Sequence, residues 1–195
     1  MDCVGGSAMR RALGRAFFGM LVVGLLVGCS PPVQVGASNR EPSYQGKITR
    51  VLVVTSLRAP GLNATQNEGF VRASEIRQSL NATWSPLGVA LEVIDMDPSP
   101  GMPEQRTQFA PQQILTLAVE GYTLYQRVVD SYAVDASLYE VSTGKRVWRG
   151  KVYFRGMEDS GRIRHNGFGG AISHQNDADD LVRELTAKLK ADKLL

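Results

Sequence analysis

Residues 134–154 read Val-Asp-Ala-Ser-Leu-Tyr-Glu-Val-Ser-Thr-Gly-Lys-Arg-Val-Trp-Arg-Gly-Lys-Val-Tyr-Phe. Apolar and polar side chains alternate up to Val141, and the alternation resumes at Trp148. A period of two is typical of strands that bury one face and expose the other. Between the two runs, residues 142–145 have the composition of a turn. The stretch therefore predicts an antiparallel hairpin with one buried face.

The other face of this hairpin is predicted to carry aromatic and charged side chains. Charge pairing between neighbouring strands, worth a few tenths of a kcal/mol per pair, would explain the charges without any functional role. A surface that faces a binding partner is the alternative. The candidate partner-facing residues are Tyr139, Arg149, Lys151, Tyr153 and Arg155.

The region before the hairpin alternates strand and helix signals. The β-branched run at 51–54 predicts a strand over 48–56 that is covered on both faces. Thr65 and Glu68 have the spacing of a capping box, which predicts a helix that starts there and ends before Pro86. The apolar segments 89–96 and 114–126 predict two further strands.

The C-terminal segment predicts a last helix. Asn176 is the expected N-cap, and the helix has acidic residues in its first turn and lysines in its last turn, which complements the helix dipole. The order of strand, helix, strand, antiparallel strands and helix predicts an α/β (α+β) sandwich, a mixed sheet with helices packed on it.

Two segments lack regular periodicity. Residues 97–111 are rich in proline, and residues 158–175 are rich in glycine, so both are predicted to be loops. Long loops inside a compact domain often bind something. One alternative function is therefore a small-ligand or glycan-binding module whose pocket is rimmed by these two loops.

The first 28 residues have the organisation of a signal peptide. Three arginines precede the uncharged stretch 16–28, whose 13 residues are too few to span a bilayer core that needs about 20 apolar residues. We expect cleavage between Gly28 and Cys29, with translation starting at Met1 or Met9. Cys29 is then the first and only cysteine of the mature chain.

Residues 26–29, Leu-Val-Gly-Cys, resemble the bacterial lipobox. In the lipobox, small residues before the cysteine permit cleavage, and the cysteine sulfur receives diacylglycerol. The resemblance implies a lipoprotein that is acylated at Cys29, with palmitate among its acyl chains. Ser30 resembles the outer-membrane sorting pattern, so the expected location is the outer membrane, facing the periplasm.

The segment after Cys29 contains three prolines and no lasting periodicity. We expect a lipidated N-terminus and tether over residues 29–46, followed by a periplasmic domain over residues 47–195. The alternative is that the segment packs along the domain as an ordered arm.

Charge and motif content argue against several function classes. Of 22 basic and 19 acidic residues, Arg10, Arg11, Arg15 and Asp2 lie in the segment expected to be removed, which leaves a net charge of +1. The mature chain therefore has no electrostatic footprint for nucleic acid.

Catalytic and metal-binding patterns are equally weak. His165 and His174, near Asp177, Asp179 and Asp180, match no metal-binding motif, and we expect no metal and no cofactor. Ser173 and His174 with an aspartate make a hydrolase a further alternative, although no GxSxG motif accompanies them. We expect no enzymatic activity.

The lipobox, the proline-containing segment, the strand at 51–54, the long helix and the hairpin at 134–150 together resemble a group of envelope lipoproteins. The group includes the curli secretion lipoprotein CsgG, the exopolysaccharide lipoprotein PelC and the activator lipoproteins of penicillin-binding proteins. The resemblance spans most of residues 47–193. It implies a non-catalytic accessory or assembly factor that binds another envelope component, and a homo-oligomer, because some members form rings.

Overall fold

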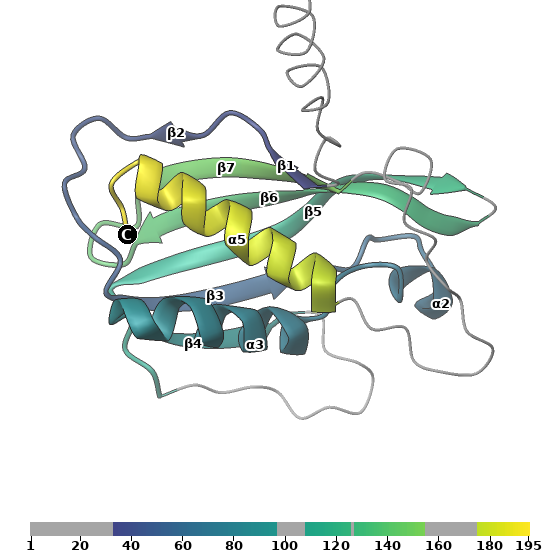
Figure 1. The fold of residues 1–195 in the computed structure, drawn as a ribbon, viewed down its shortest axis with the longest axis horizontal. Coiled ribbons are helices and arrows are strands. Elements are labelled where there is room, and N and C mark those ends of the chain that lie inside the picture. The colour runs from purple at the N-terminus through teal and green to yellow at the C-terminus, as the bar shows by residue number, and fades with distance from the viewer. Residues whose placement is uncertain (1–32, 97–107, 126, 155–174) are drawn as a thin grey trace, which may run out of the picture. The chain divides into compact units, whose positions relative to one another are not determined.

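The computed structural model describes residues 33–96, 108–125, 127–154 and 175–195 (Figure 1). The signal peptide, Cys29 and Gly28, Arg155, Ser173, both histidines and most of the two predicted loops lie outside these residues. Within the described part of the chain, no helix is long and apolar enough to cross a membrane.

One mixed sheet organises the described residues. Its strands are β1 (Val33–Val35), β2 (Asn39–Arg40), β3 (Arg50–Ser56), β4 (Ala90–Asp95), β5 (Gln113–Tyr125), β6 (Val128–Glu140) and β7 (Arg146–Phe154). Their order is β1-β7-β6-β5-β3-β4, and β2 also pairs with β7. β3 runs parallel to β4 and β5, and the other pairs are antiparallel. The predicted α/β class with a mixed sheet is confirmed.

The predicted hairpin forms β6 and β7, with the faces that the alternation indicated. Val134, Leu138 and Val152 are buried, whereas Asp135 and Lys151 are half-buried and lie opposite each other. The alternating pattern therefore identified the core face of this sheet correctly.

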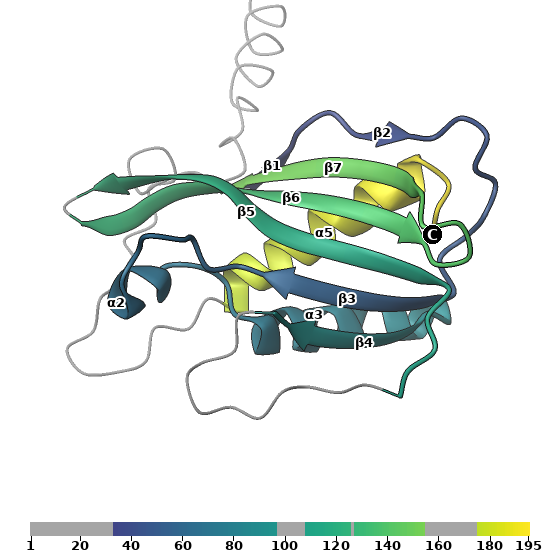
Figure 2. The same ribbon diagram turned by 180° about the vertical axis from the view of Figure 1, so that it is seen from behind.

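Helices cover one face of the sheet. The helical segments are α2 (Ala64–Asn67), α3 (Ala73–Trp84), the 3-10 turn η2 (Ser85–Leu87) and α5 (Gln175–Ala191). α3 and α5 lie in front of the sheet in Figure 1 and behind it in Figure 2. A buried hydrogen bond connects the two helices: Trp84 Nε1 of α3 donates to Thr186 Oγ1 of α5 at 2.7 Å. The core is thus the layer between these two helices and the sheet.

The first helix differs from the prediction. The continuous helix expected from Thr65 is broken into α2 and α3. Asn63 caps α2. At the start of α3, the backbone N–H of Arg72 donates to Glu75 Oε2 at 3.0 Å. The chain leaves the helix between them because Phe70 and Val71 are buried there. Burial of two apolar side chains outweighs the local capping signal.

The last helix begins slightly earlier than predicted. α5 starts at Gln175, so Asn176 lies in its first turn and is not the N-cap. The acidic first turn and the lysines of the last turn are present as expected.

Residues 33–46 form the ordered arm that was the alternative to a tether. β1 and β2 pair with β7, and Tyr44 is buried. Asp192, just after α5, holds the arm through two hydrogen bonds. Its Oδ2 accepts from Ser38 Oγ at 2.5 Å, and its backbone carbonyl accepts from Arg40 Nη1 at 2.6 Å. The same Oδ2 also accepts from Trp148 Nε1 on β7 at 2.7 Å. Among the described residues, the chain therefore packs on the sheet from Val33 onward.

Candidate interaction face

The sheet face that points away from α3 and α5 is the candidate site, and we call it the open face (Figure 2). Among the described residues, no helix lies over it. Strand register shows which side chains share it: Leu52 and Val54 on β3, Ile114, Thr116 and Ala118 on β5, Asp135, Ser137 and Tyr139 on β6, and Arg149, Lys151 and Tyr153 on β7. The face is apolar at Leu52 and Val54 of β3 and charged over β6 and β7.

A cluster of four charges lies on the β5–β7 side of the open face. Arg149 Nε lies 2.6 Å from Asp135 Oδ1, and Lys151 Nζ lies 2.7 Å from the Glu120 carboxylate. Arg149 Nη2 is also 3.6 Å from Glu120 Oε1, which links the two pairs. Glu120 has no partner residue across the strand, since the register shifts between Val119 and Gly121. The bulge leaves the Glu120 side chain near both cations.

The carboxylates stabilise the charged form of both cations. The hydrogen bond to Asp135, followed by the Asp135 charge, raises the pKa of Arg149, and the hydrogen bond to Glu120 raises the pKa of Lys151. The side chains of Arg149 and Lys151 are still 41% and 33% exposed. Exposed ion pairs of this kind add little to folding stability. The four charges are thus matched to one another and accessible.

Four of the five predicted partner-facing residues lie together on the open face. They are Tyr139, which is half-buried, Arg149, Lys151 and Tyr153, which is 42% exposed. The fifth, Arg155, lies outside the described residues. The sequence interpretation missed Glu120, the carboxylate that joins Lys151 and Arg149, although the Glu-Gly pair within a strand pattern is a signal for a bulge.

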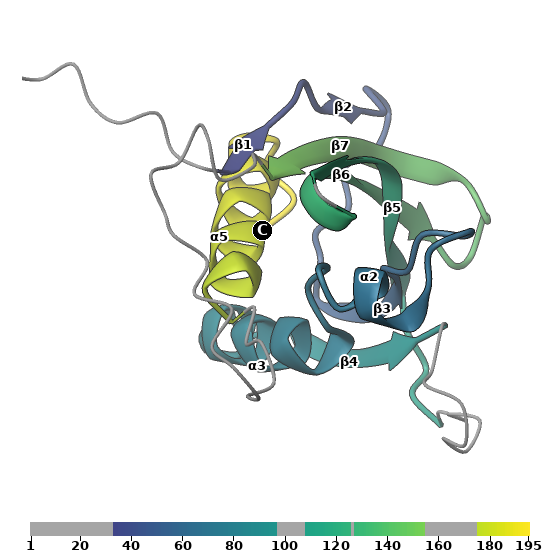
Figure 3. The same ribbon diagram turned by 90° about the vertical axis from the view of Figure 1, so that its right-hand side faces the viewer.

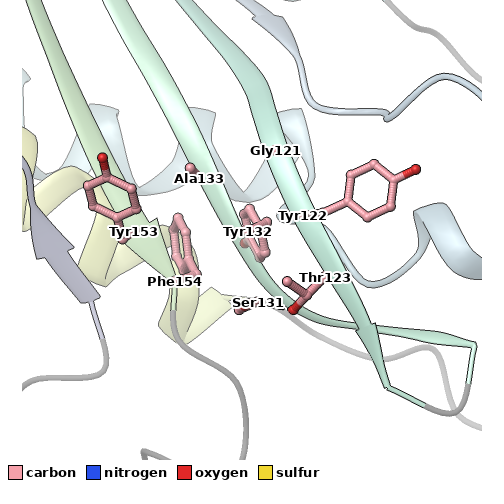
Figure 4. Close-up of a pocket in the computed structure, with 8 residues that line it drawn as sticks. All are labelled: Gly121, Tyr122, Thr123, Ser131, Tyr132, Ala133, Tyr153 and Phe154. Carbon is pink, nitrogen blue, oxygen red and sulfur yellow. Dashed lines mark hydrogen bonds between the residues drawn. The ribbon is translucent and has the colours of Figure 1, made fainter.

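Beside Tyr153 the open face has a hollow of about 380 Å³ (Figure 4). Its lining includes Gly121, Thr123, Ser131 and Ala133, whose small side chains leave room next to the tyrosine ring. The hydroxyls of Thr123 and Ser131 lie 2.6 Å apart and hydrogen bond to each other. The hollow is therefore a shallow recess that the Thr123 and Ser131 hydroxyls make polar at one side.

A second hollow, of about 510 Å³, lies between the arm and the β6–β7 turn. Its charged lining is mixed, with Glu41 and Glu140 against Lys145 and Arg146. Glu140 accepts a hydrogen bond from Thr143 within the turn at 2.8 Å.

Within the described residues, no three His, Cys, Asp or Glu side chains gather closely enough to hold a metal ion. The predicted candidates His165, His174 and Ser173 lie outside this part of the chain. The open face itself offers paired charges, tyrosine rings and apolar strand residues, which suit recognition of another molecule.

Comparison with known proteins gives distant likenesses only. The sequence matches no known protein family and no curated protein. Two structures of a PelC dodecamer from Paraburkholderia phytofirmans are similar at 18% identity, covering 79% of this chain and 95% of theirs, with a TM-score of 0.39. Protein XCC0632 from Xanthomonas campestris, of family DUF330, is similar at 11% identity, covering 79% and 94%, with a TM-score of 0.38. These likenesses are too distant to place the chain in a family.

Proposed function

We propose that this protein is a non-catalytic lipoprotein of the outer membrane, facing the periplasm, that binds another envelope component through its open face. Acylation at Cys29 would hold it on the membrane. In this role it is an accessory or assembly factor, and its action is to present the open face to a partner. Self-assembly into a homo-oligomer stays a prediction.

The observation that carries this proposal is the chemistry of β3. Its central residues, Val51–Val54, are apolar on both faces, which is typical of strands that are covered on both sides. α3 and α5 cover the face of Val51 and Val53, whereas Leu52 and Val54 belong to the open face, over which no described helix lies. Leu52 is 9% exposed and Val54 is half-buried, so this part of the open face is a low apolar surface between more exposed neighbours. An apolar strip beside a matched charge cluster is the composition of a protein interface, with a hydrophobic centre and a polar rim.

The charge cluster contributes specificity to this proposed interface. Exposed charges steer association and reject partners of the wrong charge pattern more than they add affinity. Because Asp135 and Glu120 already hold the two cations, their positions are set before a partner arrives.

Photo-crosslinking in cells tests the proposal. A photoreactive phenylalanine analogue at Tyr153 lies on the open face, and the same analogue at Ala187 lies on the exposed side of α5. We expect crosslinks to one defined envelope protein from Tyr153 and none to that protein from Ala187. Equal capture from both positions, or capture from neither, would contradict a role for the open face.

The membrane attachment has its own test. Mass spectrometry of the mature N-terminus is expected to find Cys29 carrying acyl chains, and fractionation is expected to place the protein with the outer membrane. Three acyl chains bind a bilayer firmly, whereas a single chain binds only marginally. A Cys29→Ala variant should therefore leave the membrane fraction while its domain still folds.

A further inference from the structure

The β5–β6 hairpin extends past the described parts of the other strands of the sheet (Figures 1 and 2). Pairing with β3 ends at Ala118, and pairing with β7 ends at Tyr132. Beyond the Tyr122–Tyr132 pair, residues 123–125 and 127–131 therefore form a two-stranded extension. We call this extension, with Tyr122 and Tyr132 at its base, the ribbon. An isolated two-stranded hairpin is only marginally stable in water, so the ribbon needs support from the rest of the molecule.

That support comes from α2 and from a row of aromatic rings. Gln66 Nε2 donates to the Arg127 carbonyl at 3.2 Å, and Figure 3 shows α2 beside this end of the sheet. At the base of the ribbon, the Tyr132 ring stacks on Phe154 with centroids 4.3 Å apart and meets Phe70 edge-on at 5.0 Å. The ribbon is thus held in place by packing at its base.

The ribbon carries two large apolar side chains that this packing leaves exposed. Tyr122 is 37% exposed and touches Phe70 edge-on, and Leu124 is 43% exposed. Tyr122 pairs with Tyr132 and Leu124 pairs with Val129, and both partners are buried on the same side of β6, so Tyr122 and Leu124 share that face of the ribbon. Exposed apolar groups on a projecting element indicate a surface that meets something less polar than water.

Strand register places the ribbon beside the point where the N-terminal segment enters the sheet. Val33 pairs with Phe154, Phe154 with Tyr132, and Tyr132 with Tyr122. These four residues form one row across β1, β7, β6 and β5, about 14 Å wide at the usual strand spacing. β1 begins at this row, and the ribbon continues beyond the same row.

Chain length then limits how far a lipid at Cys29 can lie from this row. The four residue steps from Cys29 to Val33 span at most about 14 Å. Leu124 lies two residues beyond the row, which is about 7 Å along the strand, and the turn of the ribbon lies further out. A bilayer that holds acyl chains on Cys29 is therefore within reach of the ribbon.

We propose that the ribbon is a membrane-contact element, whose Tyr122 and Leu124 enter the interfacial region of the lipid bilayer beside the acylated Cys29. The inference rests on the proposed lipidation. Tyrosine and leucine suit this depth because a tyrosine ring is apolar with a polar end and leucine prefers the acyl boundary. The acyl chains supply the affinity, and the ribbon sets the orientation of the domain. The bilayer would then lie at the ribbon end of the sheet.

Fluorescence of a single label on the lipidated protein tests this element. The mature chain has no cysteine apart from Cys29, so Leu124→Cys and Ser142→Cys each give one reactive thiol. Ser142 is exposed in the β6–β7 turn, at the other end of β6 from the ribbon, and is the matched control. The lipidated variants are placed in vesicles of phosphatidylethanolamine and phosphatidylglycerol, with a quencher attached to the acyl chains.

A label at Leu124→Cys is expected to shift its emission to the blue and to be quenched, whereas a label at Ser142→Cys does neither. Far-UV circular dichroism checks folding, and Tyr122→Cys replaces Leu124→Cys if that variant does not fold.

Equal emission from the labels at residues 124 and 142 in acylated, vesicle-bound protein would overturn the ribbon contact and leave the proposed lipoprotein standing. A shift at Leu124→Cys that vanishes when protein is diluted into more lipid would assign the ribbon to a second copy and also overturn it. If Cys29 carries no acyl chains, both proposals fail together.

Discussion

Trp148 and Gly150 show how single residues decide packing in the hairpin. The Trp148 side chain is buried, and its ring crosses directly over Gly150, two residues along the same strand face. A Cβ at position 150 would lie 2.7 Å from Trp148 Cη2. The glycine is therefore required by close packing of the indole.

Gly150→Ala is expected to lower the free energy of unfolding by about 1–3 kcal/mol, because the added methyl forces the buried indole to move. Urea denaturation measures this change. Gly121→Ala is the matched control, since a Cβ there meets nothing within 4 Å, and its effect should stay within about 0.5 kcal/mol. Equal losses for the two variants would show that the indole contact is not the cause.

The hydrogen bond between Trp84 and Thr186 is a second test at this scale. Thr186→Val keeps the side-chain shape but removes the acceptor, and the buried indole N–H of Trp84 is left without its partner. We expect a loss of about 1–3 kcal/mol in thermal or urea unfolding. Thr143→Val, which removes an exposed hydroxyl in the β6–β7 turn, should change stability by no more than about 0.5 kcal/mol.

Lys151 gives a prediction for pH. The hydrogen bond to Glu120 raises the pKa of Lys151 in the folded state. The stability that this pair contributes is therefore fully present below the pKa that Lys151 has in the unfolded chain. It is lost as pH rises through the pKa of Lys151 in the folded protein. The stability difference between the wild type and Lys151→Met should thus be constant through neutral pH and shrink only in alkaline solution. In a Glu120→Gln background this pH dependence should disappear, and its persistence there would contradict the assigned pair.

At the scale of elements, the N-terminal arm depends on contacts with distant parts of the chain. β1 and β2 contain three and two residues, too few to be stable alone. They are held by pairing with β7 and by the groups that meet at Asp192.

Asp192→Ala is expected to release the arm, since Ser38 and Trp148 lose a common acceptor. Hydrogen–deuterium exchange should become faster for the backbone amides of residues 33–44 while those of β3 and β5 keep their protection. Lys190→Ala, an exposed change on the last turns of the same helix, should leave all of these rates unchanged. Uniform acceleration over the whole sheet would mean that Asp192 supports global stability and not the arm.

At the scale of the whole molecule, the sheet has two unlike faces. One is sealed by α3 and α5, and the open face carries an apolar strip and four charges in its β5–β7 part. The proposed interface predicts that the charges matter for binding and not for folding.

Neutralising both cations of the cluster, with Arg149→Gln and Lys151→Met together, should reduce partner capture from Tyr153 about 2- to 10-fold. The pair Arg183→Gln and Lys190→Met on α5 removes the same formal charge from the opposite side and should leave capture unchanged. Circular dichroism is expected to show both double variants folded. A loss of capture that the α5 control reproduces would point to net charge and not to the open face.

The amino-acid sequence by itself determined which residues form the central strands and which way they face. Alternation is a local property, since successive strand residues point to opposite sides. It therefore places Val134, Leu138 and Val152 in the core and Lys151 and Tyr153 on the opposite face without any tertiary contact. The same alternation predicted four of the residues that the structure brings together in the candidate site.

The tertiary structure decided which strands and side chains are neighbours. Glu120 reaches Lys151 only because a bulge and the β5–β6–β7 order bring strands together, and the short strands β1 and β2 exist only because β7 offers an edge. The helix expected from Thr65 is interrupted at Phe70 because burial of that ring in the core outweighs a cap of about 1 kcal/mol. Periodicity specifies the face of a strand but not its neighbour, and neighbours are chosen by contacts between segments far apart in the chain.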